Sequence, residues 1–243
     1  MKKIFIPLFL VTGISNLFCK QAEEKQRPNI LFCIADDISY PHMQAYGTPW
    51  LHTPGFDQVS QKGLLFQRMY TCNAKSSPSR ACIITGRNSW QLEEACNHWP
   101  DFPAKFKSYP EVLAENGYKV GATGKGWGPG FANDSLGNAR NIVGKMWNQI
   151  KLTPPTKGSE DQPFCFWYGA LEPHRGYEFG SSLKAGKNIN QIDSVPSFWP
   201  DNEAVRTDML DYALEIEHFD KHLVAILQIL EAAGEMENTN VIG

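Results

Sequence analysis

The residues best suited to chemistry stand in a run of twelve, from Ser76 to Arg87, that reads SSPSRACIITGR. Ser76 could act as a nucleophile, but a bare hydroxyl is weak in that role unless a base or a metal activates it. Arg80 follows four residues later, so both side chains would lie on one side of a helix that begins early enough. The permanent charge of the guanidinium would then stand beside the hydroxyl. Taken alone, the run fits equally well a loop-to-helix turn in which a serine caps a buried helix start.

Two adjacent carboxylates, Asp36 and Asp37, follow an apolar run at residues 29–35. The run predicts a strand that is buried on both faces of a parallel sheet. Two neighbouring negative charges at the end of such a strand are costly unless something compensates them, and they suit a hard divalent cation that binds through oxygen. A solvated pair in a loop, or a helix N-cap, remains an alternative reading of the same residues.

The apolar pattern predicts strands that alternate with helices. The predicted strands cover residues 29–35, 118–122 and 164–169, with another that begins at 240; the predicted helices cover 53–63, a stretch from about 79, 108–117 and 207–233. This alternation predicts an α/β fold with a mainly parallel sheet flanked by helices. Ligand sites in such sheets lie off the carboxyl ends of the strands. Because Asp36, Lys125 and His174 each follow a predicted strand, we expect them at one edge of the sheet.

Local signals mark several helix ends. Thr53 and Pro54 are typical of an N-cap and a first helical residue. Ser108 and Glu111 have the spacing of a capping box. Glycine, asparagine and proline are frequent in residues 126–162, which predicts loops there.

The chain has 243 residues, a formal net charge of −3 and 42% hydrophobic residues, an ordinary globular balance with no basic surplus that would indicate nucleic acid. A basic start and a short apolar run in residues 1–26 predict an export signal, which leaves 27–243 as the folded part. Cys19 would allow a lipid anchor, so we expect a periplasmic protein or a membrane-anchored lipoprotein. The cysteines contain no C-x-x-C pair, which argues against a zinc site; one disulfide could form.

The run from Ser76 resembles the signature of the type I sulfatases. In that family the serine or cysteine is oxidised to formylglycine, the catalytic nucleophile, so the resemblance implies a maturation enzyme for serine-type sites as a partner. It also implies that Arg80 holds the aldehyde hydrate and the sulfate oxygens. The stretch from Pro28 to Asp37 resembles the opening strand of sulfatases, which implies that Asp36 and Asp37 bind Ca²⁺ together with the modified Ser76.

A second stretch, from Gly117 to Lys125, resembles another sulfatase signature, whose lysine contacts the sulfate group. Trp127 stands where the family usually has a histidine, and an indole can neither act as a cation nor relay a proton. His174 matches a histidine that contacts the scissile oxygen or nitrogen, and it is the candidate general acid because histidine exchanges protons near neutral pH. The plainer alternatives are a surface lysine in a glycine turn and a loop histidine with a structural hydrogen bond.

The resemblance extends from residue 27 to 243 and implies an alkaline-phosphatase-like fold. Several stretches, among them Pro173 to Arg175 and Val195 to Pro200, look most like the sulfamidase (heparan N-sulfatase) group. The substrate would then be a sulfated sugar of glycosaminoglycan type, cut at an N–S or an O–S bond. In sulfatases the strand that begins at Asn240 leads to an Asp-Asn pair that completes the calcium site. We therefore expect an incomplete N-terminal part of a sulfatase that is inactive or unstable alone.

Two other functions are compatible with the same sequence. A phosphoester hydrolase of the same architecture would use unmodified Ser76, but such enzymes usually carry histidine and aspartate clusters at two metal sites. A non-catalytic carbohydrate-binding pseudo-sulfatase would be compatible with Trp127, whereas intact Ser76, Arg80 and Lys125 argue against it.

Overall fold

The computed structural model describes residues 27–147 and 162–243. The predicted export signal and Cys19 lie outside the described residues, as does part of the predicted loop region. A five-stranded sheet, entirely parallel, has the strand order β5-β3-β6-β1-β7. Its strands are β1 (Asn29–Ile34), β3 (Lys119–Gly124), β5 (Lys145–Trp147), β6 (Phe164–Gly169) and β7 (Thr239–Ile242). The predicted α/β fold with a parallel sheet is confirmed.

The sheet separates two apolar layers, and β1 contributes alternate side chains to each. Leu31 and Cys33 belong to the larger core, whereas Phe32 and Ile34 pack against the smaller one on the opposite face. This explains why the strand reads as an unbroken apolar run, since both of its faces are covered. In β6 all six residues are buried, as expected for the strand at the centre of the sheet.

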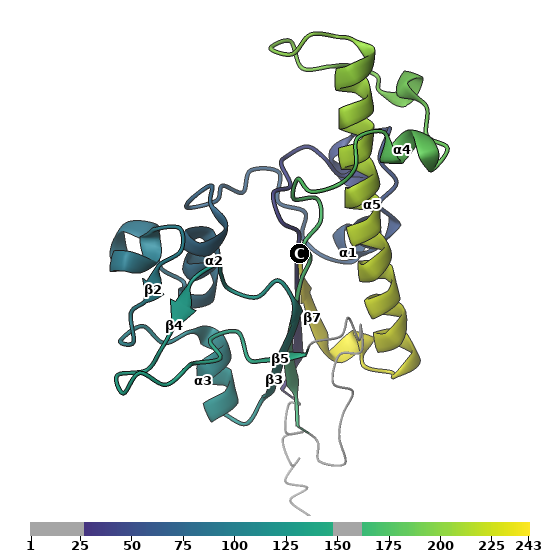
Figure 1. The fold of residues 1–243 in the computed structure, drawn as a ribbon. Coiled ribbons are helices and arrows are strands. Elements are labelled where there is room, and N and C mark those ends of the chain that lie inside the picture. Colours follow the sequence, from purple (N-terminus) through teal and green to yellow (C-terminus); the bar gives the residue numbers. More distant parts are fainter. Residues whose placement is uncertain (1–26, 148–161) are drawn as a thin grey trace, which may run out of the picture.

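Helices α1 (Pro54–Lys62) and α5 (Glu203–Ala232) cover one face of the sheet, α5 runs well past its carboxyl edge, and the short α4 (Ser181–Lys184) packs against α5 there (Figure 1). The predicted long helix is confirmed, although it begins four residues earlier than expected. Asn202 explains this start, because its side chain accepts a hydrogen bond from Val205 N and caps the helix. Leu210, Ile216 and Leu223 are among its residues buried against the sheet.

The opposite face carries α2 (Ser76–Thr85) and α3 (Tyr109–Glu115) together with a small two-stranded sheet of β2 (Asp101–Phe102) and β4 (Phe131–Ala132) (Figure 1). The predicted capping box is confirmed: Ser108 accepts from Glu111 N, and the Glu111 carboxylate accepts from Ser108 N at 2.9 Å. Short 3₁₀ helices complete the chain at Gln44–Tyr46, Ser89–Gln91, Glu93–Cys96, Ile189–Gln191 and Met236–Asn238.

Two local predictions were wrong in detail. Thr53 does precede α1, but its hydroxyl accepts from Gln44 N and does not cap the helix. The cap comes instead from α5, whose buried Asp220 carboxylate accepts from Gly55 N at 2.8 Å and Phe56 N at 2.7 Å. Asp220, which is distant in sequence, therefore accepts the hydrogen bonds of the free N–H groups at the helix start, the role that we expected for Thr53. The region predicted as loops contains β4 and β5 within its described part.

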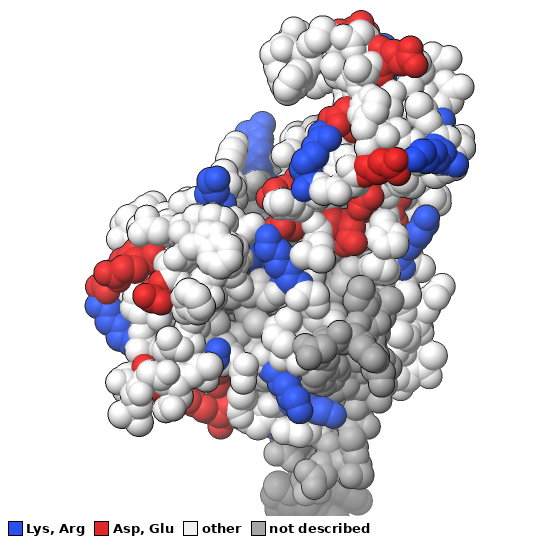
Figure 2. Space-filling view, viewed as in Figure 1, with Lys and Arg blue, Asp and Glu red and all other residues white. Residues whose placement is uncertain are grey.

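All five described cysteines, Cys33, Cys72, Cys82, Cys96 and Cys165, are free thiols. Among the described helices none is long and apolar enough to span a bilayer. Figure 2 shows acidic and basic side chains interspersed over the face in view, with no extended patch of one sign.

Candidate active site

The carboxyl ends of three strands bring the predicted site residues together. Asp36 follows β1, Lys125 follows β3 and His174 follows β6, and the three line one pocket at this edge of the sheet. Ser76 joins them from the first turn of α2, which packs beside the sheet. The sequence-based expectation that these residues meet at one edge is therefore confirmed in the geometry.

Ser76 is the first residue of α2, and its hydroxyl lies between two charged groups. Its Oγ donates to Asp36 Oδ1 at 3.2 Å and accepts from Lys125 Nζ at 2.8 Å. The residue at the N-cap position is Lys75, so Ser76 does not serve as a cap. Because the hydroxyl points to the site and lies at the positive end of the helix, developing negative charge on this oxygen would be favoured.

Asp36 is the buried carboxylate of the site. It accepts from Arg80 Nη2 at 3.1 Å through one oxygen and from Lys125 Nζ through the other. Burial alone would raise the pKa of Asp36, but the Lys125 hydrogen bond and the two positive charges outweigh it and hold the pKa below its usual range. The carboxylate is therefore ionised throughout the neutral range, held between two cations.

Arg80 lies one turn below Ser76 and is almost fully buried, at 2% exposure. Its Nη1 donates to the carbonyl oxygens of Lys125 and Gly126, both at 3.0 Å, while Nη2 binds Asp36. Its guanidinium lies 5.9 Å from the ring centre of Trp167. All of these contacts are with other residues of the site, and Arg80 does not line the pocket. Its role toward sulfate oxygens therefore stays a prediction.

Close packing of two glycines fixes the loop that carries Lys125. A Cβ on Gly124, whose φ is +73°, would lie 2.1 Å from the carbonyl oxygen of Gly169, and a Cβ on Gly169 would lie 1.7 Å from that of Lys125. Lys125 N donates to Gly169 O at 2.6 Å, and Trp167 Nε1 donates to Lys125 O at 3.0 Å. The glycines of this motif thus set the position from which the lysine reaches Ser76.

Asp37 and His174 form the solvent-facing side of the site. Their side chains are 57% and 55% exposed, and His174 Nε2 lies 3.7 Å from Asp37 Oδ2. The backbone of Asp37 has a φ of +67°, an uncommon conformation that aspartate tolerates better than most residues and that concentrates at functional positions. His174 Nδ1 also lies at hydrogen-bond distance, 3.0 Å, from the Arg175 carbonyl oxygen, so the exposed ring is held by its own loop on the open side of the site.

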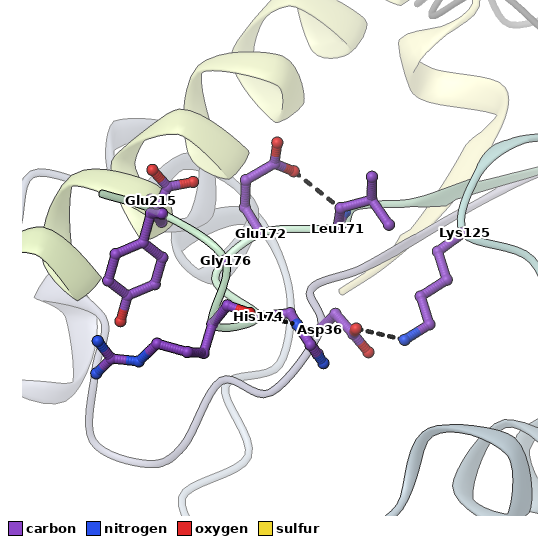
Figure 3. A pocket seen from close by; sticks show the side chains of 9 residues that line it. Asp36, Lys125, Leu171, Glu172, His174, Gly176 and Glu215 are labelled. Carbon is purple, nitrogen blue, oxygen red and sulfur yellow. Dashed lines mark hydrogen bonds and ion pairs between the residues drawn. The ribbon is translucent and has the colours of Figure 1, made fainter. Parts of the chain in front are cut away.

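The pocket between these residues has a volume of about 430 Å³ and also contains acidic groups that the sequence did not single out (Figure 3). Glu172 comes from the loop after β6, and Glu215 comes from α5. Glu172 stands two residues before His174, so the sequence stretch that indicates this histidine already includes the glutamate. Glu215 had no such signal, because only the packing of α5 across the sheet places it in this pocket.

Trp127, which replaces the expected histidine, packs into the smaller core. Its ring meets that of Phe102 edge to face at 5.3 Å, and its buried Nε1 has no hydrogen-bond partner within the described residues. The residue is not among those that line the pocket. The indole therefore acts in packing, and His174 is the histidine that the described structure presents to the pocket.

The oxygen donors at this edge fit a hard cation in kind. Within residues 27–147 and 162–243 no three His, Cys, Asp or Glu side chains converge closely enough to hold a metal, so the donors are Asp36, Asp37 and the Ser76 hydroxyl. The Lys125 ammonium contacts both Asp36 and Ser76, so in this structure it provides the positive charge that a metal ion would provide there. The arrangement thus shows a place that attracts positive charge and is bordered by oxygen ligands.

Comparison with known proteins identifies the family. The sulfatase family model matches residues 28–158. The chain is 29% identical over 187 residues to an N-acetylglucosamine-6-O-sulfatase of Bacteroides thetaiotaomicron, covering 65% of this chain and 32% of that protein. It is 28% identical over 253 aligned positions to human N-sulphoglucosamine sulphohydrolase, covering 90% and 50%. The chain thus spans half or less of the length of these two curated relatives.

Solved structures agree on the fold. A 2-O GAG sulfatase matches with a TM-score of 0.62 and 18% identity, covering 88% of this chain and 57% of that one. The phosphonate monoester hydrolase of Agrobacterium radiobacter matches with a TM-score of 0.57 and 18% identity, covering 88% and 61%. At this identity the likeness concerns the fold alone, whereas the family model covers more than half of the sequence and includes Ser76, Arg80 and Lys125. The chain therefore belongs to the sulfatase family.

Proposed function

We propose that the whole protein, of which this chain carries the predicted nucleophile, hydrolyses the sulfate ester or N-sulfate of a sugar through a formylglycine made from Ser76. The observation that carries the proposal is the position of Ser76 Oγ, 2.8 Å from Lys125 Nζ and 3.2 Å from Asp36 Oδ1, at the carboxyl edge of the sheet. The names of the curated relatives support a sulfated amino sugar of glycosaminoglycan type as the substrate, cut at an O–S or an N–S bond.

An aldehyde hydrate at position 76 would supply one hydroxyl that attacks sulfur and a second whose collapse to the aldehyde expels sulfate. Lys125 would neutralise the sulfate oxygens, because its ammonium already lies within hydrogen-bond distance of Ser76 Oγ. His174 would give a proton to the leaving oxygen or nitrogen from the open side of the pocket. Arg80 would hold Asp36 and the Lys125 loop in place, and its guanidinium would also contact the aldehyde hydrate.

We further propose that Asp36, Asp37 and the modified Ser76 hold Ca²⁺, for which the family resemblance and the hard oxygen donors are the support. The ion would supply positive charge where the sulfate oxygens gain negative charge. A maturation enzyme would oxidise Ser76 before export, and export would lead to the periplasm or, through Cys19, to a lipid anchor. The mass of the N-terminal peptide from the mature protein tests both export and lipidation.

The deciding experiment is peptide mass spectrometry of the protein purified after co-expression with a formylglycine-generating enzyme. We expect the peptide that contains Ser76 to lose about 2 Da, the two hydrogens removed when the alcohol becomes an aldehyde. The whole protein, matured in the same way, should then release sulfate from N-sulfoglucosamine or from N-acetylglucosamine 6-sulfate. The Ser76→Ala variant should show neither the mass loss nor sulfate release.

Two other outcomes would point to the remaining functions. Phosphate release from a phosphomonoester by unmodified Ser76 would favour a phosphoester hydrolase, for which the fold match to a phosphonate monoester hydrolase gives some support. Binding of a sulfated sugar by the matured protein without any turnover would favour a carbohydrate-binding pseudo-sulfatase. Unmodified Ser76, with the maturation enzyme active on another substrate, would reject the formylglycine proposal.

A further inference from the structure

Charged side chains line both ends of the pocket. Lys125 lies beside Ser76 and pairs with Asp36, whereas Glu172 and Glu215 contribute carboxylates from the side of α5 (Figure 3). The volume of about 430 Å³ is within the range of small-molecule sites, and it exceeds what a sulfate group alone requires. The part of the pocket away from Lys125 is therefore available to the group that carries the sulfate.

Neither carboxylate has a permanently charged partner among the described residues. In the described part of the chain, no lysine or arginine pairs with either Glu172 or Glu215. Arg175 also lines the pocket, but both of its Nη atoms donate to Asp208, at 2.6 and 2.5 Å. His218 Nε2 lies 4.0 Å from Glu172 Oε1.

Glu172 lies close enough to Glu215 for its charge to act on that carboxyl group. Burial raises the pKa of Glu215, and the charge of Glu172 raises it further. One oxygen of Glu172 accepts from Leu171 N at 3.1 Å, which leaves its other oxygen toward His218. Two neighbouring carboxylates would repel a sulfate or a uronate placed against them, but they are strong acceptors for hydroxyl and amine donors.

We propose that Glu172 and Glu215 form a sugar-recognition wall, which accepts hydrogen bonds from the hydroxyl or amine groups of the sugar whose sulfate lies at Ser76 and Lys125. This inference rests on the proposed function and extends it, because it assigns specificity to residues outside the catalytic set. The wall selects a sugar with donor groups on the side away from the scissile sulfate, and it disfavours a second anionic group there.

Isothermal titration calorimetry on the full chain separates the two ends of the pocket. The probes are inorganic sulfate, which reports the Lys125 end alone, and N-sulfoglucosamine, which also reaches the wall. Protein produced without a maturation enzyme keeps Ser76 unmodified, so binding is measured without turnover. The variants are Glu172→Gln, Glu215→Gln, Lys125→Ala and, as a matched control, Glu231→Gln, which changes an exposed glutamate of the same helix outside the pocket.

We expect Glu172→Gln and Glu215→Gln each to weaken N-sulfoglucosamine binding by about tenfold, the value of one charge-assisted hydrogen bond. Both should leave the affinity for inorganic sulfate within about twofold, because the hydrogen bonds of Lys125 go to Asp36 and Ser76 and neither glutamate takes part in them. Lys125→Ala should weaken both probes, and Glu231→Gln should change neither. Circular dichroism spectra like that of the wild type would show that the variants remain folded.

Different results would reject different statements. If both wall variants bind N-sulfoglucosamine as well as the wild type does, or more tightly, the wall does not recognise the sugar, and sulfate binding still stands. If they weaken both probes equally, the glutamates act on the site as a whole and the inference is wrong. If wild-type protein binds neither probe, the sulfate site and the wall are both rejected. If Lys125→Ala binds both probes like the wild type while the two wall variants still lose N-sulfoglucosamine binding, the proposed sulfate contact of Lys125 is rejected and the wall stands.

Discussion

Lys125 Nζ lies 2.8 Å from Ser76 Oγ and also contacts the buried carboxylate of Asp36. One flexible side chain from β3 thus connects the candidate nucleophile to the candidate metal ligand, although 49 residues separate Lys125 from Ser76 in the sequence. An ammonium and a divalent cation cannot occupy the same position, so Lys125 and a bound metal ion would compete for the Asp36 carboxylate.

Removal of Lys125 should strengthen calcium binding at Asp36. The ammonium competes with the ion for the same carboxylate, so Lys125→Ala should lower the dissociation constant for Ca²⁺ by roughly tenfold, a screened fraction of the full Coulomb term. Calcium titration calorimetry measures this directly, and Asp36→Asn should abolish binding in both backgrounds. The matched control is Lys62→Ala, at the exposed end of α1. Unchanged or weaker calcium binding by Lys125→Ala would show that the lysine does not stand in for the ion.

Arg80 should be among the most sensitive positions of the fold. Arg80→Met removes one of the two cations on a buried carboxylate, takes the side-chain donor from the Gly126 carbonyl oxygen and leaves the Lys125 carbonyl oxygen with Trp167 Nε1 alone. We expect the free energy of unfolding in urea to fall by about 3–5 kcal/mol. The double variant with Asp36→Asn should recover part of that loss, because the unpaired buried charge is then absent. Arg175→Met, at an exposed ion pair, should cost at most about 1 kcal/mol; a similar loss at both arginines would contradict the prediction.

The glycine contact beneath Lys125 should tolerate no side chain. Gly169→Ala would place a methyl group 1.7 Å from the Lys125 carbonyl oxygen, so the two strand ends would have to separate. We expect the variant to lose at least about 2 kcal/mol of unfolding free energy, the range of overpacking in a close-packed interior. Gly137→Ala is the control, since its φ is +86° but nothing lies within 4 Å of the added atom. Its cost of about 1 kcal/mol would report backbone conformation alone.

Acid should weaken the capping box of α3. Burial opposes ionisation of Glu111, but the hydrogen bonds from Arg140 and from Ser108 N outweigh it and lower the pKa of Glu111. The ionised form is therefore favoured in the folded state, so its stabilisation is fully present above the unfolded pKa of about 4.3 and disappears as the pH falls through the folded value. We expect Glu111→Gln to cost about 1 kcal/mol at pH 7 and progressively less below about pH 4.

Urea unfolding of the wild type and Glu111→Gln across this pH range tests that prediction. Glu115→Gln is the matched control on the same helix, because Glu115 forms an exposed pair with Lys107 and should matter little. A stability difference for Glu111→Gln that stays constant between pH 7 and pH 3 would show that the cap does not depend on the charge of Glu111.

The sequence by itself determined four strands of the main sheet, β1, β3, β6 and β7, and the meeting of the candidate residues at one edge, but not β2, β4 or β5. Apolar runs are buried on both faces and so can be recognised locally, as in β1 and β6. The site could be predicted because each of its residues follows a strand or opens a helix, and parallel strands present their carboxyl ends at one edge. The resemblance around Ser76 then gave the family, which the family model supports.

Tertiary structure alone decided the contacts between segments that are distant in sequence. Asp220 caps α1 in place of Thr53, and Arg80 contacts Asp36 and the Lys125 loop instead of facing the pocket. Glu215 enters the site only because α5 packs across the sheet beyond its carboxyl edge. Sequence periodicity indicates which face of a helix is buried, but the register of that face against a sheet depends on the packing of the whole core.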